Sequence, residues 1–213
     1  MWPKILQATA ETLYLVTATL FFASIAGLLL GLLLYATRPG NVLQSRAVHL
    51  GLNLVINVVR PIPFIIFIVA LTPVTRAVIG TSIGPNAAIF AMTIAAALSV
   101  ARIVENNLVA VPVGVVEAAA AMGASPFTIL VRVVVPEALG PLILGLTYIL
   151  VALIDFSAMA GVVGGGGLGS LAMVYGYQRF EIEVMLITIV ILVLLVQLAQ
   201  LLGNKLTRII MRR

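Results

Sequence analysis

The sequence has no cysteine, a single histidine and few charged residues, which make up 9% of its 213 positions. The absence of cysteine excludes disulfide bonds and thiol chemistry. The net charge of +5 comes from basic residues that are scattered singly and not clustered on one face, which argues against nucleic-acid binding. The chain therefore offers few groups for covalent chemistry.

Apolar residues, in contrast, make up 62% of the chain. A soluble domain of this length could not bury so much apolar surface in one core, so the composition predicts an integral membrane protein. The uncharged runs are long enough for helices to cross about 30 Å of hydrocarbon at about 1.5 Å per residue. They lack the short alternating segments of barrel strands. We therefore expect an all-α integral membrane protein with a single transmembrane domain over residues 1–213.

Uncharged stretches predict about five transmembrane helices. The second is interrupted by Arg60 and by neighbouring prolines, so we expect Arg60 near the inner membrane boundary, with Pro61 and Pro63 bending the helix there. The predicted spans lie between Glu11 and Arg38, around Gly51 to Thr72, between Arg76 and Arg102, from about Pro141 to Val163 and from about Val184 to Leu202.

The basic residues predict the orientation of these helices. Most of them lie in the first connection, in the third connection and in the C-terminal tail, which the positive-inside rule places in the cytoplasm. An odd number of spans then puts the N-terminus outside. The first residues lack the basic segment and cleavage site of a removable signal peptide, so none is expected. His49 falls in the first connection, where we expect a solvated loop residue.

A patterned loop of about residues 105–140 interrupts the apolar sequence on the cytoplasmic side. An alanine-rich run predicts a short helix that Gly123 ends with a left-handed cap. Ser125 is placed to cap a second helix with Pro126 at its first position, and Pro136 is expected to stop it. An amphipathic segment resting on lipid headgroups is the alternative, but a single arginine is few for such a helix.

The same segment resembles the EAA loop of ABC importer permeases. In that pattern E-A-A is followed by three residues, a glycine, nine residues, an aliphatic, any residue, an aliphatic and a proline. The matching residues are Glu117, Ala118, Ala119, Gly123, Val133, Val135 and Pro136. The resemblance implies a type I ABC importer permease fold, in which the loop helices, including Ser125 and Pro126, act as a coupling helix that docks onto a separate cytoplasmic ATPase.

Further segments resemble the permeases of methionine importers in particular. They are TRPG at Thr37–Gly40, RPIPFIIF at Arg60–Phe67, IGTSIG at Ile79–Gly84, ARIVENNL at Ala101–Leu108 and SAMAGVVGGGGLG at Ser157–Gly169. The resemblance implies a homodimer, two ATPase subunits and an extracytoplasmic substrate-binding lipoprotein, in the bacterial inner (cytoplasmic) membrane. Related permeases for quaternary ammonium compounds such as glycine betaine share the glycine-rich segment, so that substrate class stays open.

The glycine-rich segment ends the fourth predicted span. It contains a formal G-x-G-x-x-G, but no strand precedes it, so we expect no nucleotide site there. The P-loop pattern G-x-x-x-x-G-K-[ST] is also absent from the sequence. We therefore expect no cofactor in this chain, with ATP and Mg²⁺ bound by the partner ATPase. The residues expected to form a flexible gating segment are Gly161, Gly164, Gly165, Gly166 and Gly167.

Four residues of the fourth span are candidates for a substrate pathway. Phe156 and Met159 lie among small residues and are predicted to form a soft apolar constriction, although helix packing alone would also explain the small residues. Asp155 is the one acidic residue inside a predicted span, and we hypothesise that it meets the ammonium of a zwitterionic substrate. The candidates are Asp155, Phe156, Ser157 and Met159.

These features predict a permease subunit that passes methionine by alternating access and catalyses no reaction itself. An ion-coupled secondary transporter is the alternative from a different class, but it would usually show inverted repeats and several intramembrane ionisable residues. An intramembrane enzyme would need more than one histidine and one intramembrane carboxylate. We therefore expect no catalytic residue and no metal site in this chain.

Overall fold

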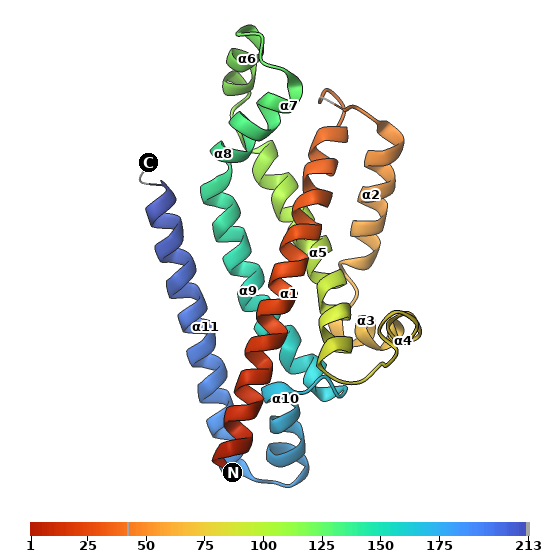
Figure 1. The fold of residues 1–213 in the computed structure, drawn as a ribbon, viewed down its shortest axis with the longest axis vertical. Helices are drawn as coiled ribbons and strands as arrows, with labels where there is room; N and C mark the ends of the chain where they lie inside the picture. The colour runs from red at the N-terminus through yellow and green to blue at the C-terminus, as the bar shows by residue number, and fades with distance from the viewer. Residues whose placement is uncertain (42, 212–213) are drawn as a thin grey trace.

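The computed structural model describes residues 1–41 and 43–211, and its elements there are helices joined by short connections (Figure 1). The helices are α1 (Trp2–Thr37), α2 (Arg46–Val59), α3 (Phe64–Ala70), α4 (Thr72–Ile79), α5 (Pro85–Val109), α6 (Val113–Ala121), α7 (Pro126–Ile129), α8 (Val135–Glu137), α9 (Leu139–Val162), α10 (Gly167–Leu171) and α11 (Ile182–Met211). Two π-helical turns complete them, Leu130–Val134 and Ala172–Gln178.

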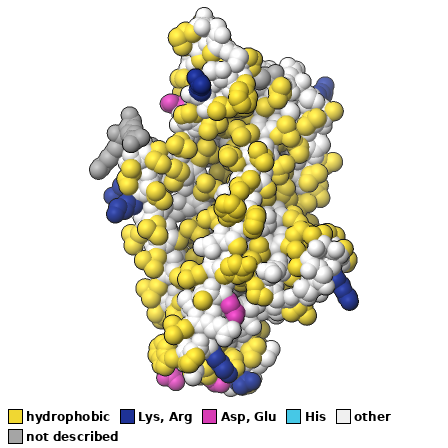
Figure 2. All heavy atoms as spheres, viewed as in Figure 1, with side chains coloured by type: hydrophobic (Ala, Val, Ile, Leu, Met, Phe, Trp, Pro, Cys, Tyr) yellow, Lys and Arg dark blue, Asp and Glu magenta, His cyan; other side chains and the backbone are white. Residues whose placement is uncertain are grey.

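The long helices α1, α5, α9 and α11 are each long and apolar enough to cross a membrane, and α2 with α3, bent by 108°, meets the same criteria as a pair. The predicted all-α membrane fold is therefore confirmed. The N-terminus lies at one end of the molecule, with α10, whereas α6 and α7 project from the opposite end (Figure 1). Hydrophobic side chains cover most of the visible face, and Lys and Arg lie toward its ends and edges (Figure 2).

Helices α1 and α5 pack closely because two glycines of α1 face α5. A Cβ at Gly27 would lie 2.5 Å from the Val100 Cβ, and a Cβ at Gly31 would lie 2.5 Å from the Val104 Cβ. Small residues spaced by four allow two membrane helices to approach in this way, since their association depends on van der Waals contact. This contact holds the N-terminal helix against the centre of the fold.

The second span is broken where Arg60 and two prolines follow α2. The missing N–H groups and fixed φ of the prolines end one helix and start the next, with Pro63 as the N-cap of α3. Helix α2 has 14 residues, which span about 21 Å. Helix α2 begins at the end that carries α6 and α7 (Figure 1), and Arg60 is the C-cap at its other end. The place of Arg60 near the inner membrane boundary stays a prediction.

The predicted bounds of the cytoplasmic loop also need correction. Helix α5 runs to Val109, so the connection begins after the predicted residue 105. Pro136 does not stop the second loop helix, because the chain continues into α8 and then α9. The π-helical turn before Pro136 explains this continuation: the N–H of Val135 donates to the Leu130 carbonyl, five residues back. The wider turn leaves room for the ring of Pro136 and tolerates the absence of its backbone N–H.

His49 is not a solvated loop residue as predicted, because it lies on α2 and is half-buried. Its Nδ1 is 3.2 Å from the Leu34 carbonyl oxygen, and its Nε2 is 2.9 Å from Nδ2 of Asn53. The connection between α1 and α2 is shorter than the sequence suggested, and polar residues at positions 49, 53 and 57 share one face of α2. The histidine therefore links α2 to α1.

Candidate functional site

The loop formed by α6 and α7 is held in shape by hydrogen bonds of its own backbone. Gly123 has a φ of +79°, a left-handed conformation that favours glycine. Its N–H donates to the Ala120 carbonyl at 2.9 Å, and the N–H of Ala124 donates to the Ala119 carbonyl at 3.1 Å. These bonds close the end of α6 as a Schellman-type cap. The Ser125 hydroxyl accepts from the N–H of Thr128 at 3.3 Å and caps α7.

The two faces of this loop differ in exposure. Ala119 is 4% exposed and packs within the chain, whereas Glu117 and Ala118 are exposed. Met122 and Phe127 are 82% and 72% exposed, so the accessible surface of this loop includes large apolar side chains as well as the Glu117 carboxylate. Of the two alanines of the EAA pattern, therefore, only Ala118 is accessible to a partner. Sequence analysis missed Met122, although its position directly before the cap glycine was a usable signal.

The candidate pathway residues on α9 point in different directions. The Phe156 ring stacks on the Phe64 ring of α3, with centroids 4.4 Å apart and planes 6° apart. Met159 is half-buried in the same core, and the hydroxyl of buried Ser157 donates to the Ile154 carbonyl at 2.7 Å. Asp155 instead is exposed and lines a hollow of about 320 Å³ between α9 and α11. Asp155 and Phe156 therefore do not face one shared cavity within this chain.

The glycine-rich segment leads into α10, which folds back against α9 and α1. A Cβ at Gly161 would lie 2.8 Å from the Gly166 carbonyl oxygen, and a Cβ at Gly165 would lie 2.7 Å from the Ala160 carbonyl oxygen. Gly164, Gly166 and Gly167 have φ values of +91°, +85° and +73°. These glycines serve close packing and left-handed turns in the structure, and their gating role stays a prediction.

Helix α1 supplies the groups that hold the start of α10. The Glu11 carboxylate accepts the N–H of Gly167, and the hydroxyl of buried Thr12 accepts the N–H of Leu168, each at 2.8 Å. These N–H groups have no partner inside α10, so the two side chains act as caps supplied by another helix. Sequence analysis gave neither residue a role, although Glu11 was the only acid near the first span.

An ion pair within α5 is linked to α2 by two hydrogen bonds. Arg102 donates to the Glu105 carboxylate at 2.6 Å, and its second terminal nitrogen donates to the side-chain oxygens of Asn53 and Asn57, each at 2.8 Å. The Arg102 side chain is 17% exposed and that of Glu105 5%. The amide oxygens and the carboxylate satisfy the guanidinium, and its hydrogen bonds to the two asparagines connect α5 to α2.

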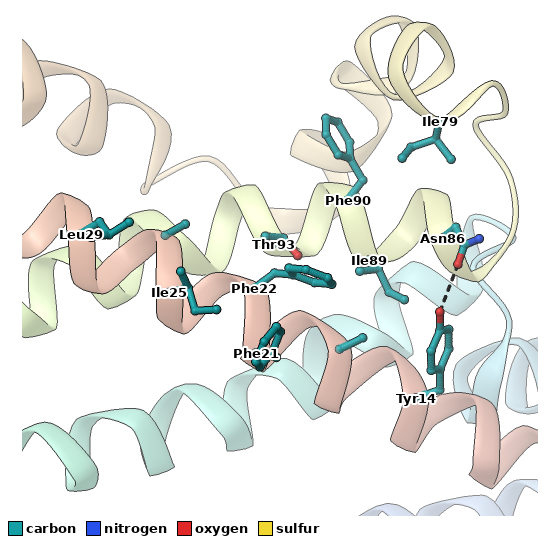
Figure 3. Close-up of a pocket in the computed structure, with 12 residues that line it drawn as sticks. Tyr14, Phe21, Phe22, Ile25, Leu29, Ile79, Asn86, Ile89, Phe90 and Thr93 are labelled. Atoms are coloured by element: carbon teal, nitrogen blue, oxygen red, sulfur yellow. Dashed lines mark hydrogen bonds between the residues drawn. The ribbon is translucent and has the colours of Figure 1, made fainter.

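Figure 3 shows an apolar hollow of about 650 Å³ between α1, α4 and α5. The Tyr14 hydroxyl donates to Oδ1 of Asn86 at 3.3 Å at one end, and aromatic rings such as Phe21, Phe22 and Phe90 line the rest. No Asp, Glu, Lys or Arg lines this hollow, so it lacks the groups that hold an amino acid's charges.

Charged and aromatic groups meet at the end of the molecule that carries the N-terminus. Lys4 donates to the Tyr175 hydroxyl at 2.6 Å, and Lys4 and Arg179 lie 4.7 and 4.5 Å from its ring centroid. The hydrogen bond from Lys4 lowers the pKa of Tyr175 below its ordinary value, and the positive charges of Lys4 and Arg179 add to this. Within the described residues, no three His, Asp or Glu side chains gather as metal ligands would.

The comparisons with known proteins agree with one another. Residues 23–213 match the family model for "Binding-protein-dependent transport system inner membrane component". The probable D-methionine transport system permease protein MetI of Vibrio cholerae is 43% identical over 204 residues, covering 96% of this chain and 91% of that protein. The methionine import system permease protein MetP of Bacillus subtilis is 42% identical over 207 residues, covering 97% and 93%.

A solved structure of inward-facing conformations of the MetNI methionine ABC transporter has a TM-score of 0.96 and 41% identity, covering 99% of this chain and 97% of that chain. An amino acid ABC transporter with histidines shares the fold at a TM-score of 0.81 and 21% identity. The resemblance to ABC importer permeases is therefore confirmed over nearly the whole chain. The chain belongs to the family of binding-protein-dependent transport system inner membrane components.

Proposed function

We propose that the chain is the membrane-spanning subunit of an ABC importer for methionine. The observation that carries the proposal is the likeness to named methionine permeases over 96–97% of the chain. The proposal places the N-terminus outside the cell and the α6–α7 loop in the cytoplasm. The distribution of basic residues supports that orientation, since most of them lie in the connections and the tail on the loop side.

The energy for transport comes from a separate ATPase that docks on the α6–α7 loop. The exposed face with Glu117, Ala118, Met122 and Phe127 supports this role, because a carboxylate beside apolar side chains suits a protein groove better than headgroups. Two copies of the chain form the pathway, two ATPases bind ATP and Mg²⁺, and an extracytoplasmic lipoprotein delivers substrate. Glu117, Ala118, Ala119, Gly123, Ser125, Pro126 and Pro136 belong to the coupling segment.

The pathway runs along the half of α9 that contains Phe156, Ser157 and Met159. The stack of Phe156 on Phe64 supports this placement, because it ties α9 to the broken second span. Movement of either helix would separate the rings, which is what a constriction must do when a substrate passes. Asp155, which shares no cavity with Phe156, is proposed to meet the substrate ammonium at a different stage of its passage. The segment from Gly161 to Gly167 is proposed to take up the movement.

The proposed function is tested by reconstituting the chain with its ATPase and binding protein in vesicles. ATP hydrolysis is measured with a panel of amino acids and with glycine betaine. Stimulation by methionine is expected. Stimulation by the quaternary ammonium compound alone would overturn the substrate, and uptake driven by a proton or sodium gradient without the ATPase would overturn the class.

Two variants test individual roles in the same vesicles. Gly123→Pro should leave the protein folded in membranes but abolish ATPase binding or coupling, because proline cannot adopt the left-handed φ at that cap. Normal transport by this variant would contradict the docking role. Asp155→Asn should reduce methionine uptake, and unchanged uptake with unchanged ATPase stimulation would remove Asp155 from the pathway.

A further inference from the structure

Arg60 lies at the end of α2 and Arg102 lies on α5, and the surroundings of the two arginines differ. Arg102 is satisfied by a carboxylate and two amide oxygens. The guanidinium of Arg60, in contrast, makes no hydrogen bond or ion pair with any residue that the structure describes, and it is exposed. An ionisable side chain at membrane depth that lacks a protein partner usually faces water or a ligand.

Two hollows meet at Arg60. One of about 40 Å³ is lined by Arg60 together with Phe64, Ser99 and Phe156, so it reaches the stacked rings of the proposed pathway. The other, of about 340 Å³, is lined by Asn57, Arg60 and Pro61. The guanidinium therefore stands between an aromatic pair and a polar recess.

The side chain of Asn57 is oriented by Arg102. Its Oδ1 accepts from Arg102 at 2.8 Å, and that bond leaves the NH₂ group as the part of Asn57 available to another acceptor. No hydrogen bond from that NH₂ group occurs within residues 1–41 and 43–211. Arg60 and Asn57 thus present a planar cation and a neutral donor to the same recess.

We propose that Arg60 and Asn57 bind the carboxylate of the amino-acid substrate, with Arg102 as the positioning residue that aims the amide of Asn57. A guanidinium fits a carboxylate with two parallel hydrogen bonds, and the amide adds a third donor. The rings of Phe64 and Phe156 then line the space for the apolar side chain of the substrate. This inference rests on the proposed function, because it names the group of the imported molecule that this site recognises.

Chemical labelling of the parent complex tests the site directly. An arginine-selective dicarbonyl is added with methionine or with methioninamide, which lacks the carboxylate, and modification is measured by mass spectrometry of peptides. Methionine is expected to slow modification of Arg60 several-fold, whereas methioninamide should leave the rate of modification unchanged. Arg76 on α4, also exposed, is the control and should react equally in all samples. Equal protection by both compounds, or none by methionine, would overturn the proposal.

Substitutions provide a second, independent test. Arg60→Gln should lower methionine uptake by about ten- to a hundredfold while binding-protein-stimulated ATP hydrolysis persists, because a charge-assisted hydrogen bond is lost. Methionine uptake by Arg60→Lys should lie between that of the parent and that of Arg60→Gln. Uptake by Arg76→Gln should equal that of the parent. Asn57→Asp keeps the acceptor for Arg102 but replaces the donor with a carboxylate, so it should reduce uptake about tenfold or more by repulsion.

The two proposals fail in distinguishable ways. If the parent complex imports no methionine, the proposed function is wrong. If the parent imports methionine but Arg60→Gln transports at the parent rate, only the carboxylate site is wrong. A parallel fall of uptake and ATP hydrolysis in both Arg60 variants would mean that Arg60 merely holds the break between α2 and α3, and it would also overturn the site.

Discussion

Replacement of Gly161 by alanine should loosen the contact between α9 and α10. The added Cβ would lie 2.8 Å from the Gly166 carbonyl oxygen and 2.8 Å from the Gly169 carbonyl carbon, and it would also contact the Ser170 nitrogen. These are backbone atoms, which cannot rotate away as a flexible side chain would. Overpacking of this kind costs about 1–3 kcal/mol, and we expect the upper part of that range.

The gain in helix propensity from glycine to alanine offsets about 1 kcal/mol of this cost, which leaves a net loss of about 2 kcal/mol. For a chain of this size such a loss lowers the melting temperature by about 4–8 °C. The chain has no cysteine, so a thiol-reactive dye cannot report unfolding. The fraction of detergent-solubilised protein that still elutes as the native peak after heating is measured instead.

Gly51→Ala is the matched control, because a Cβ at Gly51 meets no atom within 4 Å and the residue lies inside α2. It should leave the melting temperature unchanged or raise it slightly. If Gly161→Ala is as stable as Gly51→Ala, α10 does not pack on α9 as the structure has it, and the glycine-rich segment would be loose and not close-packed.

Further predictions concern the two ends of the molecule. Thr12→Val removes the acceptor of the Leu168 N–H and should cost about 1 kcal/mol of stability, measured by the same heating assay with Thr12→Ser as control. Lys4→Met should raise the pKa of Tyr175 toward its ordinary value, because the lowering hydrogen bond is lost. Ultraviolet titration of the parent and of Lys4→Met, each compared with Tyr175→Phe, isolates the signal of Tyr175. The parent should contain more tyrosinate than Lys4→Met just below the ordinary tyrosine pKa, and equal titration curves for these two proteins would contradict this. Ser125→Ala should speed amide hydrogen exchange in the first turn of α7, and unchanged exchange would show that its hydroxyl is not the cap.

The sequence predicted those features that depend on local rules. The long apolar runs specified the membrane helices, and the cap at Gly123 followed from the glycine after a run of helix formers. The passage of the helix through Pro136 was not predictable, because a π-helical turn depends on packing that the proline rule does not include. Local rules therefore gave the loop helices but not their continuation into α9.

The contacts of the candidate site depend on tertiary packing and were mostly missed. Nothing in the sequence near Phe64 indicates that its ring stacks on Phe156, which is 92 positions away in a separate span. The polar side chains of α2 at positions 49, 53 and 57 did indicate one shared polar face, since they recur every four residues. Only the structure distinguishes Arg102, which those groups satisfy, from Arg60, which they do not.

Accumulation of labelled methionine in vesicles that hold the chain, its ATPase and its binding protein tests the central claim most directly. The account predicts uptake against a concentration gradient only when ATP is present on the side where the α6–α7 loop lies, and loss of that uptake in Gly123→Pro although the ATPase itself stays active. Uptake without ATP, or undiminished uptake in Gly123→Pro, would contradict the claim that this loop connects ATP hydrolysis to the passage of substrate.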